Sequence, residues 1–371
     1  MTGFAATLIA WHRRHGRHHL PWQGTRDPYA IWISEIMLQQ TQVATVIPYY
    51  QRFLARFPDI STLAGAALDD VLALWSGLGY YSRARNLHRA AEIIVREHGG
   101  RFPRAVGAVL GLPGIGRSTA AAICAFAYGT RVAILDGNVK RVLARYFAVA
   151  GYPGEPRVAT RLWDKAEALL PRRDIRAYTQ AVMDLGAGIC TRRRPRCAAC
   201  PLVSQCRAYR GNRTAELPAP RPRTALPKRE TVMALLEREG RIALEKRPAA
   251  GIWGALWCLP EIDAGEDLHA ACERRFGVRI DDAVRLPVVE HGFTHFRLTI
   301  RPWHCRASEA APRALEARLA WMTLDEALKA ALPAPVRRIA LALRARSRPV
   351  ARAGNSWKDE DERLERDQSV A

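Results

Sequence analysis

The stretch Leu112-Pro113-Gly114-Ile115-Gly116 decides how the first part of the chain is interpreted. It lies between an apolar helical run that ends near Leu110 and a second run that opens at Arg117. The two glycines allow the backbone to turn tightly and to expose consecutive N–H groups beside a helix N-terminus, which suits a phosphate group. The stretch predicts a tight turn between two helices near residues 104–128, and an ordinary helix–turn–helix corner would show a similar pattern.

Residues 1–212 are predicted to be almost wholly helical, because apolar residues recur at helical spacing and strand patterns are sparse. Residues 213–230 differ, since four prolines stand there among arginine and threonine. Such a stretch cannot continue a helix and suits an extended connector.

Residues 231–345 are predicted to form an α+β domain, because alternating segments frame one helical pattern. The predicted elements are a strand pair at Thr231–Glu237 and Arg241–Lys246 around Gly240, a helix near Leu268–Phe276, and strands at Val284–Val289 and Phe296–Pro302. Residues 346–371 carry dense opposite charges and few apolar side chains, so we expect this tail to be disordered.

The net charge of +21 is distributed unevenly along the chain. Residues 1–212 hold 29 basic and 13 acidic side chains, whereas the remainder holds 28 and 23. A genome that favours arginine would explain the arginine share but not this asymmetry. The first part is therefore expected to attract a polyanion through phosphate neutralisation and counterion release.

Apolar segments give no sign of membrane association. No apolar run approaches the length of a membrane span, and the apolar stretch within residues 1–16 is too short for a secretory signal. We therefore expect a cytoplasmic protein.

Four of the eight cysteines fall within 17 residues, at Cys190, Cys197, Cys200 and Cys206, with the spacing C-x6-C-x2-C-x5-C. A structural zinc site normally uses two closely spaced pairs, and disulfides are rare in a reducing compartment. Four thiolates in one compact loop instead favour one [4Fe–4S] cluster over zinc. The arginines between the first two cysteines form either a solvated basic turn or a contact for phosphates.

The hairpin, the cysteine spacing and the stretch Leu135-Asp136-Gly137-Asn138-Val139-Lys140-Arg141 together resemble the helix–hairpin–helix DNA glycosylases, the group of endonuclease III and MutY. The segment Ser34–Thr41 and the C-terminal part narrow the resemblance to the adenine DNA glycosylase (MutY) family, over nearly residues 1–345. The resemblance implies a multidomain chain, with an all-α helix–hairpin–helix glycosylase domain, an iron–sulfur cluster loop at 190–206 and a Nudix-like α+β domain at 231–345.

This family resemblance also implies an activity. We expect a monomeric enzyme of base excision repair that removes adenine mispaired with 8-oxoguanine or guanine in double-stranded DNA. Other repair proteins are expected to have access to the connector. Relatives that also nick the strand carry a Schiff-base lysine two residues after the second hairpin glycine, whereas this chain has Ser118. A serine cannot form an imine, so the resemblance indicates a monofunctional glycosylase.

Cleavage of an N-glycosidic bond needs an acid for the leaving base and a negative group for the oxocarbenium-like sugar. Glu35 shares a predicted helix face with Ile31 and Leu38, and apolar neighbours raise the pKa of a carboxyl group. Asp136 precedes a predicted helix and would serve equally well as its cap. The resemblance implies that Glu35 protonates adenine, that Asp136 stabilises or transiently bonds the sugar, and that Asn138 helps to position that centre.

An enzyme that acts on a base in a duplex must flip it out and fill the gap. Tyr80 lies in a glycine-flanked loop, where it would serve either as a wedge between bases or as an ordinary packing aromatic. The resemblance implies lesion-strand contacts for Gln40, Thr41 and Tyr80. It also places Leu38 near the lesion and Gln180 near the adenine pocket.

The C-terminal part carries a Nudix-like pattern without the expected catalytic carboxylates. Gly251–Pro260 matches the domain, but the segment Ala270–Gly277 lacks the clustered glutamates that would bind metal. Pyrophosphatase activity is therefore not expected. The resemblance implies that the loop with Phe293, Thr294 and His295 recognises 8-oxoguanine.

Two rival functions remain from the sequence. A glycosylase with lyase activity on pyrimidine lesions is opposed by Ser118 and by the C-terminal domain. A non-catalytic iron–sulfur DNA-binding or redox-sensing protein would keep the cysteines and the basic loop but would not need Glu35 and Asp136 together.

Overall fold

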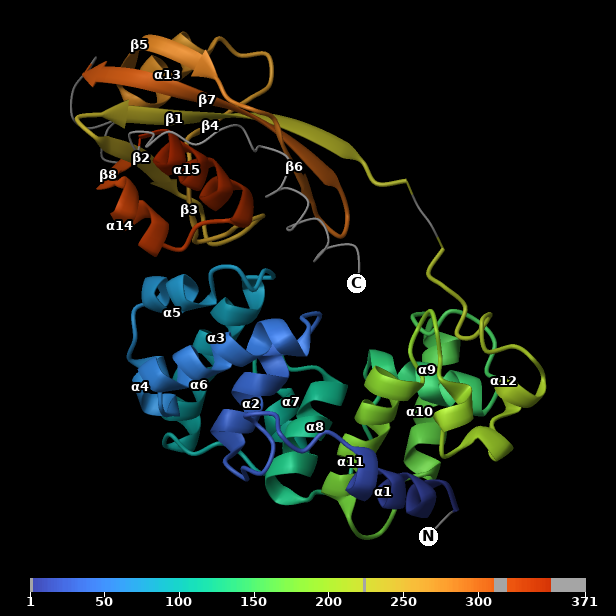
Figure 1. The fold of residues 1–371 in the computed structure, drawn as a ribbon. Coiled ribbons are helices and arrows are strands. Elements are labelled where there is room, and N and C mark those ends of the chain that lie inside the picture. Colours follow the sequence, from blue (N-terminus) through green and yellow to red (C-terminus); the bar gives the residue numbers. More distant parts are fainter. Residues whose placement is uncertain (1–2, 223–224, 310–318, 348–371) are drawn as a thin grey trace.

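The computed structural model describes residues 3–222, 225–309 and 319–347. These residues form a helical part and a sheet-containing part, joined by an extended chain at one side of the molecule (Figure 1). This arrangement confirms the predicted multidomain fold. Within the described ranges, no helix is long and apolar enough to span a bilayer.

The helical part holds short helices connected by tight turns. Its elements are α1 (Gly3–His15), α2 (Pro28–Met37), α3 (Val43–Arg56), α4 (Ile60–Ala64), α5 (Leu68–Trp75), α6 (Ser82–His98), α7 (Val106–Leu110), α8 (Arg117–Tyr128), α9 (Gly137–Tyr146), α10 (Pro156–Ala168), α11 (Ile175–Asp184), the π-helical turn η1 (Leu185–Ile189), the 3₁₀ turns η2 (Cys197–Ala199) and η3 (Val203–Gln205), and α12 (Arg207–Arg210).

Helix α8 separates two apolar cores within this part. Ala120, Ile123 and Cys124 pack with α2–α7, whereas Ala121 and the other alanines of its opposite face pack with α1, α9, α10 and α11. Small side chains let helices approach on both sides of α8. The N-terminal helix α1 returns to lie against α11 (Figure 1). The two cores therefore meet along α8, and the loops at its two ends lie at their junction.

The hairpin stands at the beginning of α8. Helix α7 ends at Leu110 and α8 begins at Arg117, as the sequence predicts, with Gly116 as the N-cap. Gly114 has φ +77°, and a Cβ atom there would lie 2.8 Å from the Cβ of Asn86 in α6. Glycine is required at this position by both the left-handed backbone and the close approach of α6.

The second part contains a mixed sheet with strand order β3-β2-β1-β7-β5; β8 pairs with β2, β4 with β1 and β6 with β7. The elements are β1 (Lys228–Arg238), β2 (Arg241–Lys246), β3 (Trp257–Cys258), β4 (Glu261–Ile262), α13 (Leu268–Phe276), β5 (Val278–Arg285), β6 (Val289–Gly292), β7 (Arg297–Glu309), β8 (Leu319–Thr323), α14 (Leu324–Lys329) and α15 (Ala334–Ser347). Strands β1 and β7 run parallel and the other pairs named above run antiparallel.

Alternate residues of β1 point to opposite faces of this sheet. Met233 and Leu235 pack with α15, whereas Ala234 and Leu236 pack with α13. The α15 face is continuous with the core of α2–α8, so the sheet domain rests on the helical part through an apolar contact. An ion pair between Lys246 Nζ and Asp69 Oδ1, at 2.5 Å, flanks it.

The strand predictions succeed where turn residues delimit them and fail beside proline. The hairpin of β1 and β2 turns at Glu239 and Gly240, both with positive φ, and α13 has its predicted limits. The single strand predicted at Val284–Val289 is wrong, because β5 ends at Arg285 and β6 begins at Val289. Pro287 between them lacks an N–H for a ladder. Strand β7 begins one residue later than Phe296 and runs seven residues beyond Pro302.

The C-terminal tail was predicted to be disordered from residue 346. Residues 346 and 347 complete α15, and 348–371 lie outside the described residues.

Substitution of Gly114 by alanine tests the hairpin. Gly114→Ala should lower the free energy of unfolding by about 1–3 kcal/mol, because it adds left-handed strain and a contact with Asn86. The control is Gly107→Ala in α7, where a Cβ meets nothing within 4 Å. That variant should be neutral or more stable by about 0.5–1 kcal/mol. Thermal unfolding followed by circular dichroism measures both, and equal effects would contradict the packing argument.

Candidate active site

Glu35 lies on α2, whose other residues from Tyr29 to Met37 are all buried. Asp27 caps α2 by accepting hydrogen bonds from the N–H groups of Tyr29 and Ala30, at 3.0 and 3.3 Å. The α2 residues next to Glu35 in sequence are buried, whereas Glu35 keeps partial access to solvent. Burial, and after it the nearby charge of Asp136, together raise the pKa of Glu35 to about 8.

Asp136 is both a helix cap and the second carboxylate of the site. Its Oδ1 accepts from the N–H of Val139 at 2.8 Å, and its Oδ2 accepts from Nδ2 of Asn138 at 3.2 Å. Burial raises the pKa of Asp136, while these two donors and the charge of Arg141 oppose that shift. Because these donors favour the ionised form of Asp136 and burial favours the neutral form of Glu35, Glu35 is the group of this pair that carries a proton at neutral pH.

Two further residues fix the position of Asp136. The hydroxyl of Ser118 accepts a hydrogen bond from the N–H of Leu135 at 3.0 Å, which anchors the chain just before the carboxylate. Arg141 donates through Nη2 to Oδ1 of Asn138 and to the carbonyl of Gly186, both at 2.8 Å. The Asn138 amide is thereby oriented with its Nδ2 toward Asp136. Sequence reasoning missed this role of Arg141, although it lies within the quoted stretch 135–141.

The four cysteines lie in one loop around a buried arginine. Arg145 is 2% exposed, and its Nη1 lies 3.3 Å from Sγ of Cys190 while its guanidinium also donates to the carbonyls of Thr191 and Arg192. Burial raises the pKa of the Cys200 thiol, and the nearby Cys190, Cys206 and Cys197 raise it as well, so the four cysteines lie close together. In the described ranges, no three side chains lie where one metal ion would bind. Four thiols in one compact loop are the donor set that a [4Fe–4S] cluster uses.

Helix α9 connects the cysteine loop with the Asp136 side of the site. Nε of Arg141 donates to the carbonyl of Cys190 at 2.7 Å, while its Nη2 holds Asn138. A Cβ on Gly186 would lie 2.6 Å from the Cβ of Asn138, so η1 packs directly on the residue beside Asp136.

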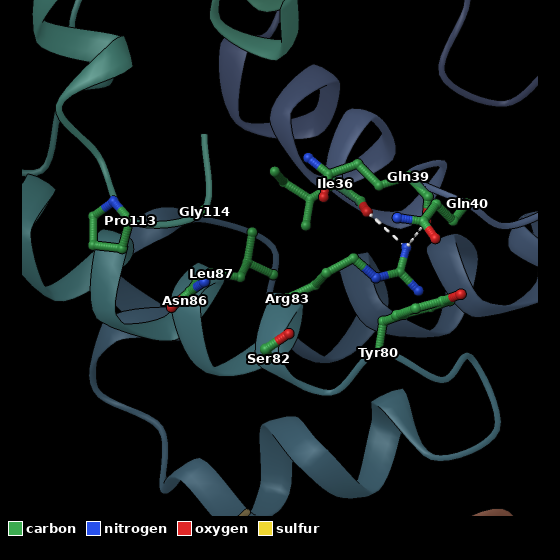
Figure 2. Close-up of a pocket in the computed structure, with 10 residues that line it drawn as sticks. All are labelled: Ile36, Gln39, Gln40, Tyr80, Ser82, Arg83, Asn86, Leu87, Pro113 and Gly114. Atoms are coloured by element: carbon green, nitrogen blue, oxygen red, sulfur yellow. Dashed lines mark hydrogen bonds between the residues drawn. The ribbon is translucent and has the colours of Figure 1, made fainter. Parts of the chain in front are cut away.

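Several of the residues expected to contact DNA line one cavity of about 220 Å³ (Figure 2). Gln40, Tyr80 and Gly114 all border it, so it joins the end of α2, the loop before α6 and the hairpin. Tyr80 is 45% exposed and has φ +48°, which is not the state of a packed core aromatic. Gln40 has φ +58°.

Three further residues were expected to contact DNA, namely Leu38, Thr41 and Gln180. Leu38 is the C-cap of α2 and packs against the core, and Thr41 Oγ1 accepts from Arg83. Gln180 does not line the cavity. It lies on α11, where its Nε2 donates to Asp184 at 2.9 Å beside the ion pair of Asp184 with Arg17.

The turn between β6 and β7 presents two polar side chains on an aromatic base. Phe293 stacks on Phe296 with ring centroids 4.4 Å apart, and Trp253 lies 5.5 Å from Phe293. Thr294 and His295 are exposed at the tip. Figure 1 shows that this hairpin extends from the sheet toward the helical part.

Comparisons with known proteins match the helical part and the sheet-containing part to two different families. The model of the HhH-GPD superfamily base excision DNA repair protein matches residues 33–168, and a NUDIX domain model matches residues 231–342. A solved structure of a thermostable thymine-DNA glycosylase superposes with a TM-score of 0.52 at 32% identity, over 56% of this chain and 95% of that one.

Curated relatives match over both parts of the chain. An adenine DNA glycosylase of Buchnera aphidicola subsp. Baizongia pistaciae is 38% identical over 91% of this chain and 95% of its own length. The adenine DNA glycosylase of Mus musculus is 32% identical over 91% of this chain and 77% of its own length. The chain belongs to the adenine DNA glycosylase family.

Proposed function

We propose that this protein is a monofunctional adenine DNA glycosylase that removes adenine paired with 8-oxoguanine or guanine. The observation that carries the proposal is the pair of Glu35, with a pKa raised to about 8, and the hydrogen-bonded carboxylate of Asp136. The names of the relatives support the same activity. We assign the chemistry to residues 1–212 and lesion recognition to residues 231–345, with 213–230 as the connector.

In the proposed reaction, Glu35 gives its proton to N7 of the flipped adenine while the C1′–N9 bond breaks and its electron pair leaves with the base. The Asp136 carboxylate stabilises the positive charge that develops on the sugar. A water molecule then attacks C1′ and transfers a proton to the Glu35 carboxylate, which restores the acid. The products are free adenine and an abasic site in an intact strand.

The single-function assignment rests on Ser118. Its hydroxyl accepts the Leu135 N–H at 3.0 Å, so the side chain serves to place the Asp136 loop. An imine with the sugar aldehyde requires a primary amine, which this position lacks.

The double-stranded DNA substrate is proposed to contact several surfaces of the helical part. Gly114 and Gly116 offer backbone N–H groups to a phosphate, and the arginines between Cys190 and Cys197 offer a second phosphate contact. Tyr80, with Gln40, Thr41 and Leu38, is proposed to fill the space opened by base flipping. Gln180 is proposed to face the flipped adenine.

We propose that Cys190, Cys197, Cys200 and Cys206 hold one [4Fe–4S] cluster. When bound, such a cluster supplies a rigid cross-link rather than a step of the base-release chemistry. The residues around it fit this role, because Arg145 ties the loop to α9 and to the carbonyl of Leu217 at 2.7 Å. The cross-link would hold the basic loop beside the DNA and α9 beside the site.

Replacement of the proposed acid tests the function. Glu35→Gln should slow single-turnover release of adenine from a duplex with one A·8-oxoguanine pair by on the order of 10²-fold or more, because it removes the proton donor. The wild-type rate should fall as pH rises through about 8, where Glu35 loses its proton. Glu155→Gln, at an exposed position of the same part, is the control.

Strand breaks in that assay should form only after hot alkali, and borohydride should trap no protein–DNA adduct. Near-normal cleavage by Glu35→Gln would disprove its role as the acid. A robust trapped adduct would disprove the monofunctional assignment.

The loop at the β6–β7 turn should set the preference for the lesion. The Thr294→Ala/His295→Ala variant should lose tenfold or more of the rate ratio between A·8-oxoguanine and A·G, since each base-edge contact is worth about 1–3 kcal/mol. His269→Ala, at an exposed position of α13, should keep the ratio. An unchanged ratio in the double variant would mean that this loop does not recognise 8-oxoguanine.

Metal analysis tests the cluster. Protein purified without air should be brown and contain about four irons and four sulfides per chain. Cys197→Ser should lower both, whereas Cys305→Ala, in the core of the sheet domain, should not. Stoichiometric zinc without iron would contradict the cluster assignment.

A further inference from the structure

Arg83 is a buried cation that the proposed base-release reaction does not use. It lies in the first turn of α6 and is 7% exposed. Its Nη1 donates to the carbonyl oxygens of Ile36, Met37 and Gln39, at 3.0, 2.8 and 2.6 Å. Figure 2 shows the guanidinium reaching the end of α2 from α6. These carbonyls belong to the last turn of α2 and the residues after it, where carbonyl groups lack N–H partners from the helix itself.

The second terminal nitrogen of Arg83 reaches a different loop. Its Nη2 donates to the carbonyls of Leu78 and Gly79, both at 3.2 Å, and to Oγ1 of Thr41 at 3.1 Å. The guanidinium also lies 5.5 Å from the ring centroid of Tyr80. One planar group therefore joins the segments 36–41 and 78–80.

Both segments contain strained backbone that this arginine fixes. Gln40 and Tyr80 adopt positive φ, which costs energy for residues other than glycine and persists only where surrounding contacts hold it. Each lies within one or two residues of acceptors of Arg83. Burial lowers the pKa of Arg83 to about 10, so the group stays charged at neutral pH and its hydrogen bonds are charge-assisted.

We propose that Arg83 is a positioning residue for base flipping, which holds the segments 36–41 and 78–80 at a fixed separation so that both enter the duplex together. This inference rests on the proposed function, because it assigns Gln40 and Tyr80 to the space that the flipped base leaves.

Lysine cannot replace Arg83 in this role. The arginine reaches six acceptors on the two segments through two separated nitrogens of a rigid plane, whereas lysine presents one nitrogen with three donors. Arg83→Lys keeps the charge but is expected to lose at least half of these contacts, so the separation of the segments is no longer fixed. Flipping should then become harder while the carboxylates stay in place. The loss should be largest where the adenine must be drawn from a paired and stacked position, since unpaired bases are extruded at lower cost.

The test compares two duplexes of one sequence, with the adenine opposite either 8-oxoguanine or a tetrahydrofuran abasic analogue. Arg83→Lys should slow single-turnover release about tenfold or more on the first duplex and under about threefold on the second. Arg89→Lys is the matched control, at an exposed position of the same helix. A 2-aminopurine at the target position should show a smaller fluorescence rise with Arg83→Lys than with the control.

An equal loss on both duplexes would show a general structural role and overturn the inference, as would wild-type rates on both. Thr41→Val removes one acceptor of Arg83 and keeps the side-chain shape, so it should shift the ratio in the same direction by about twofold to threefold. It decides the matter if Arg83→Lys fails to fold, and an unchanged ratio would then overturn the inference. Wild-type protein inactive on both duplexes would instead contradict the proposed function.

Discussion

The charge interaction between Glu35 and Asp136 requires two carboxyl groups from different cores to meet in a weakly solvated place. Glu35 belongs to the core of α2–α7, and Asp136 begins α9 in the other core. Helix α8 makes this possible, because its small residues let both cores approach it and its two ends hold the hairpin and the Asp136 loop. An anion beside a buried acid keeps that acid protonated, which is the state that donation to a leaving base needs.

The roles of the buried arginines could not be predicted from the sequence. The charge asymmetry treats every arginine of residues 1–212 as available to a polyanion. Arg83 and Arg145 are 7% and 2% exposed and donate mainly to backbone carbonyls, so part of that charge binds the chain's own backbone instead of a polyanion. No local sequence pattern reveals this role. Some acceptors of Arg83 lie more than 40 residues away in sequence, at the end of α2, and others lie in the loop just before α6. A buried guanidinium can satisfy several carbonyls that no helix or strand uses.

Local signals were otherwise reliable where they encode backbone geometry. The glycines of the hairpin, the Asp-Gly start of α9 and the turn at Gly240 each predicted an element end that the structure contains. Asp136 also shows that a capping interpretation and a functional one need not compete, because the cap bond leaves Oδ2 facing Asn138. The docking of the sheet domain could not be predicted, because Leu332 and Tyr81 are far apart in sequence and meet through a backbone carbonyl.

That docking gives Tyr80 and the loop with Thr294 and His295 a common support. The hydroxyls of Tyr81 and Ser76 donate to the carbonyl of Leu332, at 2.9 and 3.2 Å, and Arg85 donates to the carbonyl of Gly254 at 2.7 Å. The neighbour of Gly254, Trp253, packs on Phe293 beneath the exposed loop tip. Residues 76–85 therefore present the exposed Tyr80 and also hold the contacts with the sheet domain. A shift of the sheet domain relative to α6 would strain the same loop that presents Tyr80. Under the proposed function, lesion recognition by the β6–β7 loop and displacement of the adenine by Tyr80 would therefore both depend on residues 76–85.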